Sequence, residues 1–74
     1  MSITVNCFAT LAPHAPPGGS LESVPGLTVG GLIDSLAIPR DRVKTVFVNG
    51  RQAELDSPVS DGDRVGVFPA VAGG

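Results

Sequence analysis

The last four residues, Val71-Ala72-Gly73-Gly74, are the part of the sequence whose residue types most clearly predict chemistry. Glycine has no side chain, so Gly73 and Gly74 could enter a narrow channel and place the carboxylate of Gly74 in the active site of another protein. A carboxylate is unreactive until it is activated. Adenylation by ATP would convert it into a mixed anhydride, which a sulfur or amine nucleophile can attack. This segment therefore predicts a terminal carboxylate that a partner activates.

The segment from Pro69 to Gly74 is predicted to be a flexible tail on a folded domain of residues 1–68. Six residues after Phe68 can extend about 20 Å from the domain. A frayed terminus is the simpler interpretation. Frayed ends are usually polar, however, whereas Val71 and Ala72 are apolar, and we expect them to thread the partner's active site with the two glycines.

Four other residues have chemically active side chains, but a structural role is the stronger prediction for each: Cys7, His14, Asp61 and Asp63. Cys7 occupies a core position of its strand, which favours a buried, inert thiol over a sulfur relay. His14 has no second ligand at metal spacing, so we expect a solvated loop histidine and no metal site. Asp61 and Asp63 flank a glycine in a turn and lack the other ligands of a calcium loop.

The size and charge of the chain exclude several classes of protein. Its 74 residues form one domain with little room for a substrate cavity beside a core. A formal net charge of −2 argues against nucleic-acid binding. The single cysteine cannot form an intramolecular disulfide, and we recognise no signal peptide or membrane span. We therefore expect a cytoplasmic protein that does not bind nucleic acid, a membrane or a cofactor.

Alternating apolar residues and turn residues predict strands at 3–8, 21–24, 45–48, 51–55 and 64–68. Asn49-Gly50 predicts a tight hairpin, because both residues tolerate a positive φ. Segment 13–20 is rich in proline and glycine and is predicted to be a mobile loop.

One helix is predicted after the second strand, with Thr28 as its N-cap and Pro39 beyond its end. Leu27 is placed to pack against Leu32 as a hydrophobic staple. Gly30 and Gly31 weaken the helix by roughly 1 kcal/mol each relative to alanine. Tertiary packing must therefore hold the helix, through an apolar face formed by Val29, Leu32, Ile33 and Leu36.

These elements predict an α+β fold with one main helix on one face of a mixed sheet of four to five strands. The first and last strands are expected to be central neighbours. Period-two alternation places Ile3, Val5 and Cys7 under the helix, together with valines of the third and last strands. The opposite face then carries all three phenylalanines, Phe8, Phe47 and Phe68.

An exposed aromatic cluster predicts a partner-binding surface, formed here by Phe8, Phe47 and Phe68 with Pro69. The alternative is that a β-bulge reverses the alternation of one strand and puts the rings in the core. Arg51 and Arg64 could help to dock an acidic partner.

The sequence resembles the ubiquitin-like sulfur carriers, which have the β-grasp fold and include the small subunit of molybdopterin synthase and the thiamine-thiazole sulfur carrier. The resemblance covers nearly the whole chain. It rests on Ile3-Thr4-Val5, the helix around 28–32, Val48-Asn49-Gly50, Asp61-Gly62-Asp63-Arg64-Val65 and Gly73-Gly74. The three phenylalanines also fall near the positions of the hydrophobic patch of ubiquitin.

The resemblance implies that an E1-like partner uses ATP to adenylate Gly74. Sulfur from a persulfide enzyme then gives a thiocarboxylate, which is delivered to an acceptor such as the large subunit of molybdopterin synthase. The chain itself would be a carrier or non-catalytic subunit, and it has no P-loop or dinucleotide fingerprint.

The pathway and the final acceptor have alternatives. Phe68-Pro69 and the long proline-rich loop are similar to the molybdopterin synthase subunit, although Ala70 replaces a second proline usual there. The short connection 36–43 is more similar to the thiazole carrier. We expect the molybdenum or tungsten cofactor pathway first. A protein modifier conjugated through Gly74, with Lys44 as its only lysine, and a plain interaction module are the other possibilities.

Overall fold

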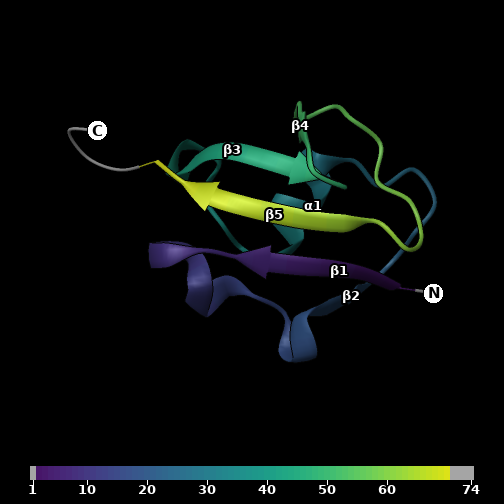
Figure 1. Ribbon diagram of the computed structural model, residues 1–74, viewed down its shortest axis with the longest axis horizontal. Helices are drawn as coiled ribbons and strands as arrows, with labels where there is room; N and C mark the ends of the chain where they lie inside the picture. Colours follow the sequence, from purple (N-terminus) through teal and green to yellow (C-terminus); the bar gives the residue numbers. More distant parts are fainter. Residues whose placement is uncertain (1, 71–74) are drawn as a thin grey trace.

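The computed structural model describes residues 2–70, which form one five-stranded mixed sheet with a single α-helix on one face (Figure 1). The strands are β1 (Ser2–Cys7), β2 (Ser20–Glu22), β3 (Val43–Val48), β4 (Arg51–Ala53) and β5 (Arg64–Pro69), and the helix is α1 (Val29–Ser35). The strand order is β2-β1-β5-β3-β4. The predicted α+β fold is confirmed.

The first and last strands are the centre of the sheet, as predicted. β1 pairs with β5 in parallel, whereas β1–β2, β5–β3 and β3–β4 are antiparallel. The arrows of β1 and β5 therefore point the same way in Figure 1, and both strands end on the same side of the sheet. The hairpin between β3 and β4 turns at Asn49 and Gly50, whose φ angles are 54° and 82°, so this prediction is also confirmed.

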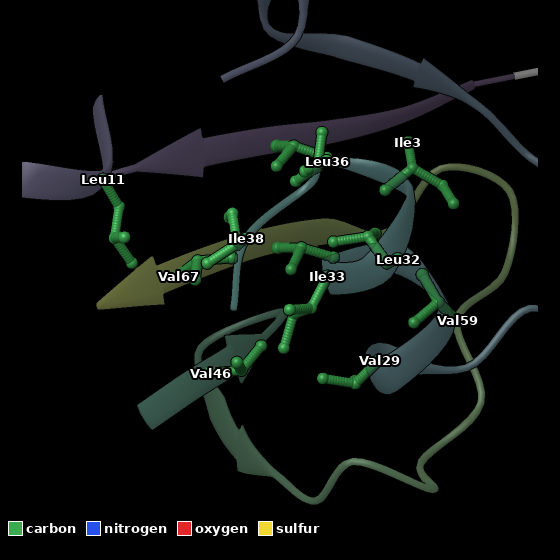
Figure 2. Close-up of a cluster of buried hydrophobic side chains, with 12 residues drawn as sticks. Ile3, Leu11, Val29, Leu32, Ile33, Leu36, Ile38, Val46, Val59 and Val67 are labelled. Atoms are coloured by element: carbon green, nitrogen blue, oxygen red, sulfur yellow. The ribbon is translucent and has the colours of Figure 1, made fainter. Parts of the chain in front are cut away.

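The hydrophobic core fills the space between α1 and one face of the sheet. The predicted alternation is confirmed, since the sheet contributes Ile3, Val5, Val46, Val65 and Val67, all nearly inaccessible to solvent. Figure 2 shows the helical side chains pointing into the same cluster. The helix contributes Val29, Leu32, Ile33 and Leu36.

The N-terminus of α1 is held by its cap and by a loop that follows β4. Thr28 Oγ1 accepts a hydrogen bond from the backbone N–H of Gly31 at 3.2 Å, which confirms the predicted N-cap. The N–H groups of Val29 and Gly30 donate to the carbonyl oxygens of Ser57 and Leu55 at 2.9 and 2.7 Å. These bonds satisfy helix N–H groups that have no partner within the helix.

The helix ends earlier than its apolar spacing predicts. Its last residue is Ser35, and Leu36 is the C-cap. Ala37 follows with a φ of 61°, and its N–H donates to the carbonyl oxygen of Asp34 at 3.0 Å. The left-handed conformation of Ala37 thus follows a helix whose last residue, Ser35, lies four positions before Pro39.

The segment predicted to be a mobile loop, 13–20, contains short regular turns, and its mobility stays a prediction. The chain forms two short 3₁₀-helices there, Ala9–His14 and Pro17–Gly19. Leu11 is only 1% exposed and enters the core (Figure 2). His14 is half-buried rather than solvated, with its Nδ1 3.3 Å from the carbonyl oxygen of Leu36. One buried leucine gives no period, so the sequence pattern could not show this packing.

The boundaries of most strands differ from the predicted ones by one or two residues. β1 stops at Cys7, so Phe8 follows the strand rather than ending it. β3 begins at Val43, and its register against β5 shifts between Val43 and Thr45. β5 includes Pro69, one residue beyond the domain end predicted at Phe68. The bulge in β3 lies before Phe47 and does not reverse the alternation that exposes this ring.

None of the helices in residues 2–70 has the length and apolar character needed to cross a membrane.

Two adjacent glycines in α1 provide a test of its packing. Gly30→Ala is expected to lower the free energy of unfolding by about 1 kcal/mol, although alanine favours a helix. The new Cβ would lie 3.2 Å from the backbone carbonyl oxygen of Leu55, which the Gly30 N–H holds at 2.7 Å. Its 2.8 Å contact with Nη2 of Arg40 can be relieved, because that atom ends a flexible side chain. Urea denaturation measures the change.

Gly31→Ala is the matched control. Its Cβ would make ordinary contacts at 3.5 Å with Leu27 and Thr28, and we expect stabilisation by up to about 1 kcal/mol. Equal stabilisation by both variants would contradict the tight packing of Gly30.

Candidate functional site

The three phenylalanines form an exposed cluster on the sheet face opposite α1, and we call it the aromatic face. Phe8, Phe47 and Phe68 are 41%, 36% and 37% exposed, which confirms their predicted outward orientation. Phe8 comes directly after β1, and Phe68 lies near the end of β5. The parallel pairing of these two strands brings both rings to the same end of the sheet.

The rings hold one another in place without being buried. Phe8 and Phe68 are stacked, with centroids 4.4 Å apart and planes 10° from parallel. In the Phe47–Phe68 pair the edge of one ring meets the face of the other, with centroids 5.7 Å apart and ring planes at 78°. Such pairs contribute about 0.5–1.5 kcal/mol beyond area burial. The aromatic face is therefore a preformed surface, and apolar surface of this kind is typical of protein interfaces.

Gly66 lies beneath the stacked rings, on the same face of β5. A Cβ at this position would lie 3.4 Å from both Phe8 Cε2 and Phe68 Cε1. The absence of a side chain therefore lets the rings lie close to the sheet. A hollow of about 290 Å³ adjoins them, lined by the three rings and by Asn6, Gly50, Arg64, Val65 and Gly66. The sequence shows only the phenylalanines, because a glycine or asparagine in a strand gives no sign of what lies above it.

The aromatic face adjoins the start of the predicted tail. Pro69, the fourth residue predicted to bind a partner, is half-buried and lies opposite Val43 in the register of β5 against β3. The N–H of Ala70 donates to the carbonyl oxygen of Arg42 at 2.9 Å, which fixes the chain just beyond the strand. The predicted tail residues Val71, Ala72, Gly73 and Gly74 lie outside the described residues.

A hydrogen-bond network fixes the beginning of β5 against the β3–β4 hairpin. Asn49 Oδ1 accepts from the N–H of Arg64 at 2.9 Å, and Asn49 Nδ2 donates to Asp63 Oδ1 at 3.0 Å. Asp63 Oδ2 accepts from the N–H of Ser60 at 2.9 Å. The Asn-Gly turn and the Asp-Gly-Asp turn, which are separate motifs in the sequence, are thus one structural unit. It positions the two strands that carry Phe47 and Phe68.

These hydrogen bonds alter the acidity of Asp63. The N–H of Ser60, and then the side-chain amide of Asn49, lower the pKa of Asp63 by stabilising its carboxylate. The structural role predicted for this aspartate is consistent with this arrangement.

The remaining candidate side chains have structural surroundings. Cys7 is half-buried against the core, and desolvation raises the pKa of its thiol, which disfavours the nucleophilic thiolate. Asp34 and Arg40 form an exposed ion pair at 2.9 Å. Among residues 2–70, no three histidine, cysteine, aspartate or glutamate side chains are grouped so that they could hold a metal ion.

Comparison with known proteins agrees with this fold and this sequence pattern. The model of the ThiS family matches residues 5–74, nearly the whole chain. The chain belongs to the ThiS family. A search of curated proteins gives no match.

Solved structures similar to this ThiS-family chain include a small archaeal modifier protein and a protein assigned as a molybdopterin converting factor subunit. SAMP1 from Haloferax volcanii is 27% identical, with a TM-score of 0.73 and full coverage of both chains. A protein assigned as molybdopterin converting factor subunit 1 from Pyrococcus furiosus is 29% identical, with a TM-score of 0.72 and coverage of 96% and 99% of the two chains. The HVO 2177 protein of Haloferax volcanii is 30% identical, with a TM-score of 0.69 and coverage of 100% and 87%. The chain is a ubiquitin-like β-grasp protein of the sulfur-carrier or small-modifier type.

The lowered pKa of Asp63 predicts a pH-dependent contribution to stability. Because the folded pKa lies below the unfolded value of about 3.9, the contribution is complete above the unfolded pKa and is lost as the pH falls through the folded one. The stability difference between wild type and Asp63→Ala should therefore be largest near neutral pH and shrink in acid. Urea denaturation at a series of pH values measures it, and a constant difference would contradict the proposed role of the carboxylate.

The aromatic face predicts a separation of binding from stability. If the aromatic face docks the E1-like enzyme expected from the sequence, Phe47→Asp should weaken that binding at least tenfold. The substitution should cost no more than about 1 kcal/mol of stability, since the ring is already partly in water. Calorimetric titration and urea denaturation measure the two effects. Val24→Asp is the matched control, because Val24 is 51% exposed and lies outside the aromatic face. A stability loss of several kcal/mol would instead assign Phe47 to the core.

Proposed function

We propose that this ThiS-family chain is a sulfur carrier in which the aromatic face docks a partner and Gly74 carries the sulfur. The observation that supports this most directly is the position of Phe68, two residues before the anchored Ala70, on the strand that leads to the tail. A partner that covers the aromatic face would thus lie beside the segment that it must modify. Docking and reaction then use the same end of the molecule.

The proposed chemistry begins at the carboxylate of Gly74. An E1-like enzyme joins one carboxylate oxygen to the α-phosphorus of ATP, which releases pyrophosphate and leaves an acyl adenylate. A persulfide sulfur from a donor enzyme attacks the acyl carbon and expels AMP. A thiol then attacks the donor's sulfur in the acyl disulfide, which forms a new disulfide with the donor enzyme and releases the thiocarboxylate. The thiocarboxylate donates its sulfur to an acceptor enzyme. The chain contributes the acyl group and the docking surface, and its partners contribute the ATP site and the catalytic groups.

The pathway we propose first is molybdenum or tungsten cofactor synthesis, with the large subunit of molybdopterin synthase as acceptor. Similarity to a protein assigned as molybdopterin converting factor subunit 1 supports this choice. The match to the ThiS family model supports the thiazole pathway as the alternative.

Protein modification is the second candidate function. Similarity to SAMP1, which is also described as a small archaeal modifier protein, favours it. An amine would then replace the persulfide as the nucleophile and form an amide with Gly74. The first steps are the same in both cases, so the two functions differ in the species that attacks the adenylate.

Intact mass spectrometry after co-expression with the E1-like enzyme distinguishes the functions. Exchange of one carboxylate oxygen for sulfur is expected to add about 16 Da to the chain. Lysine adducts on other proteins without this shift would support the modifier. If neither the mass shift nor the lysine adducts form, the chain is a plain interaction module.

Deletion of Gly73 and Gly74 is the matched control. The truncated chain should fold as the full chain does, because both residues follow the last strand, and it should show no mass shift. A truncated protein that still supports sulfur transfer would contradict the proposal.

A further inference from the structure

The hollow beside the aromatic face has one charged side chain in its lining, that of Arg64. Val65 and Val67 point into the core, so alternation places Arg64, Gly66 and Phe68 together on the outer face of β5. Apolar rings and a cation therefore share one strand face. The hollow contains no acidic side chain in its lining to balance this charge.

The guanidinium of Arg64 has no carboxylate partner in residues 2–70, where the one ion pair joins Asp34 to Arg40. The nearest acid in sequence, Asp63, is engaged elsewhere. Its two oxygens accept hydrogen bonds from Asn49 and from the N–H of Ser60. Among residues 2–70, the charge of Arg64 is thus not balanced by a carboxylate.

We propose that the hollow is an anchor site for a single apolar side chain of the docking partner, and that Arg64 pairs with a carboxylate beside that anchor. This inference rests on the proposed function and adds the chemistry of the partner surface. A volume of about 290 Å³ lies at the lower end of small-ligand sites, so it suits one large side chain rather than a peptide segment.

The chemistry of the lining favours this occupant. The rings of Phe8, Phe47 and Phe68 offer apolar contact in the lining, and Gly66 beneath the stacked rings adds no side chain to it. Guanidinium binds carboxylate through two parallel N–H···O hydrogen bonds, which sets the orientation of the partner as well as its affinity. Since Arg64 is exposed, its effect should weaken as salt is added.

A pair of small probes tests the site without any partner. 3-Phenylpropionate carries a ring and a carboxylate, and 3-phenylpropanamide is its neutral analogue. In a ¹H–¹⁵N NMR titration of the full chain, we expect 3-phenylpropionate to shift the amide signals of Phe47, Arg64, Gly66 and Phe68. Its dissociation constant should be in the millimolar range and at least about threefold lower than that of the amide.

Matched arginine variants identify the charge that matters. Arg64→Gln should remove the preference for the carboxylate probe, whereas Arg51→Gln should keep it, since Arg51 is an exposed cation that does not line the hollow. The backbone N–H of Arg64 bonds to Asn49 in either case, so the network at the start of β5 is retained. Equal binding of the two probes, or shifts confined to other residues, would overturn the proposed site.

Kinetics with the E1-like enzyme test the partner. Arg64→Gln should raise the KM for the carrier at least about fivefold at low salt with kcat unchanged, and the difference should shrink in high salt. Arg51→Gln should raise KM by a smaller factor, because Arg51 does not line the hollow. If Arg64→Gln has the KM of wild type while thiocarboxylate still forms, the anchor is wrong and the carrier function stands. If no thiocarboxylate forms with any variant but the probes bind as expected, the carrier proposal is wrong and the anchor site stands.

Discussion

The arrangement of this protein depends on the packing of one short helix against one face of one sheet. α1 has seven residues, too few to be stable alone, and it contains two glycines. Its apolar side chains are held by aliphatic residues of β1, β3 and β5 beneath them. Carbonyl groups of Leu55 and Ser57 bind the N–H groups at its N-terminus. Because this single contact accounts for most of the core, the other face of the sheet is available for a different purpose.

The parallel pairing of β1 and β5 determines what that other face can do. Both strands end on the same side of the sheet, so Phe8 and Phe68 stack close to Ala70, the last described residue. The hydrogen bond from Ala70 to Arg42 fixes the point of departure. A domain of this size has little room for a catalytic cavity. A docking face and a terminal carboxylate require only surface, which suits the proposed role of a carrier that reacts inside its partners.

Sequence patterns predicted the fold well where periodicity carried the information. Alternation correctly predicted that Ile3, Val5, Val65 and Val67 are in the core and that the phenylalanines are exposed. Asn49-Gly50 correctly predicted the hairpin. Patterns failed where a contact was isolated or distant. Leu11 is buried by packing that no period shows, and the helix ends at Ser35 because Ala37 adopts a left-handed conformation.

The features of the candidate site also fall into those that the sequence predicted and those that only the structure showed. The sequence by itself determined the residue types. Alternation places three phenylalanines on one face of the sheet, Asn49-Gly50 predicts a turn, and the predicted tail ends in Gly73-Gly74. Only the tertiary structure decided that the rings form one cluster above Gly66, that a hollow lies beside them and that Arg64 is unpaired among residues 2–70. The physical reason is that alternation specifies a face but not the register between strands. That register is set by long-range pairing of β5 with β1 and β3, which brings residues together across the whole chain.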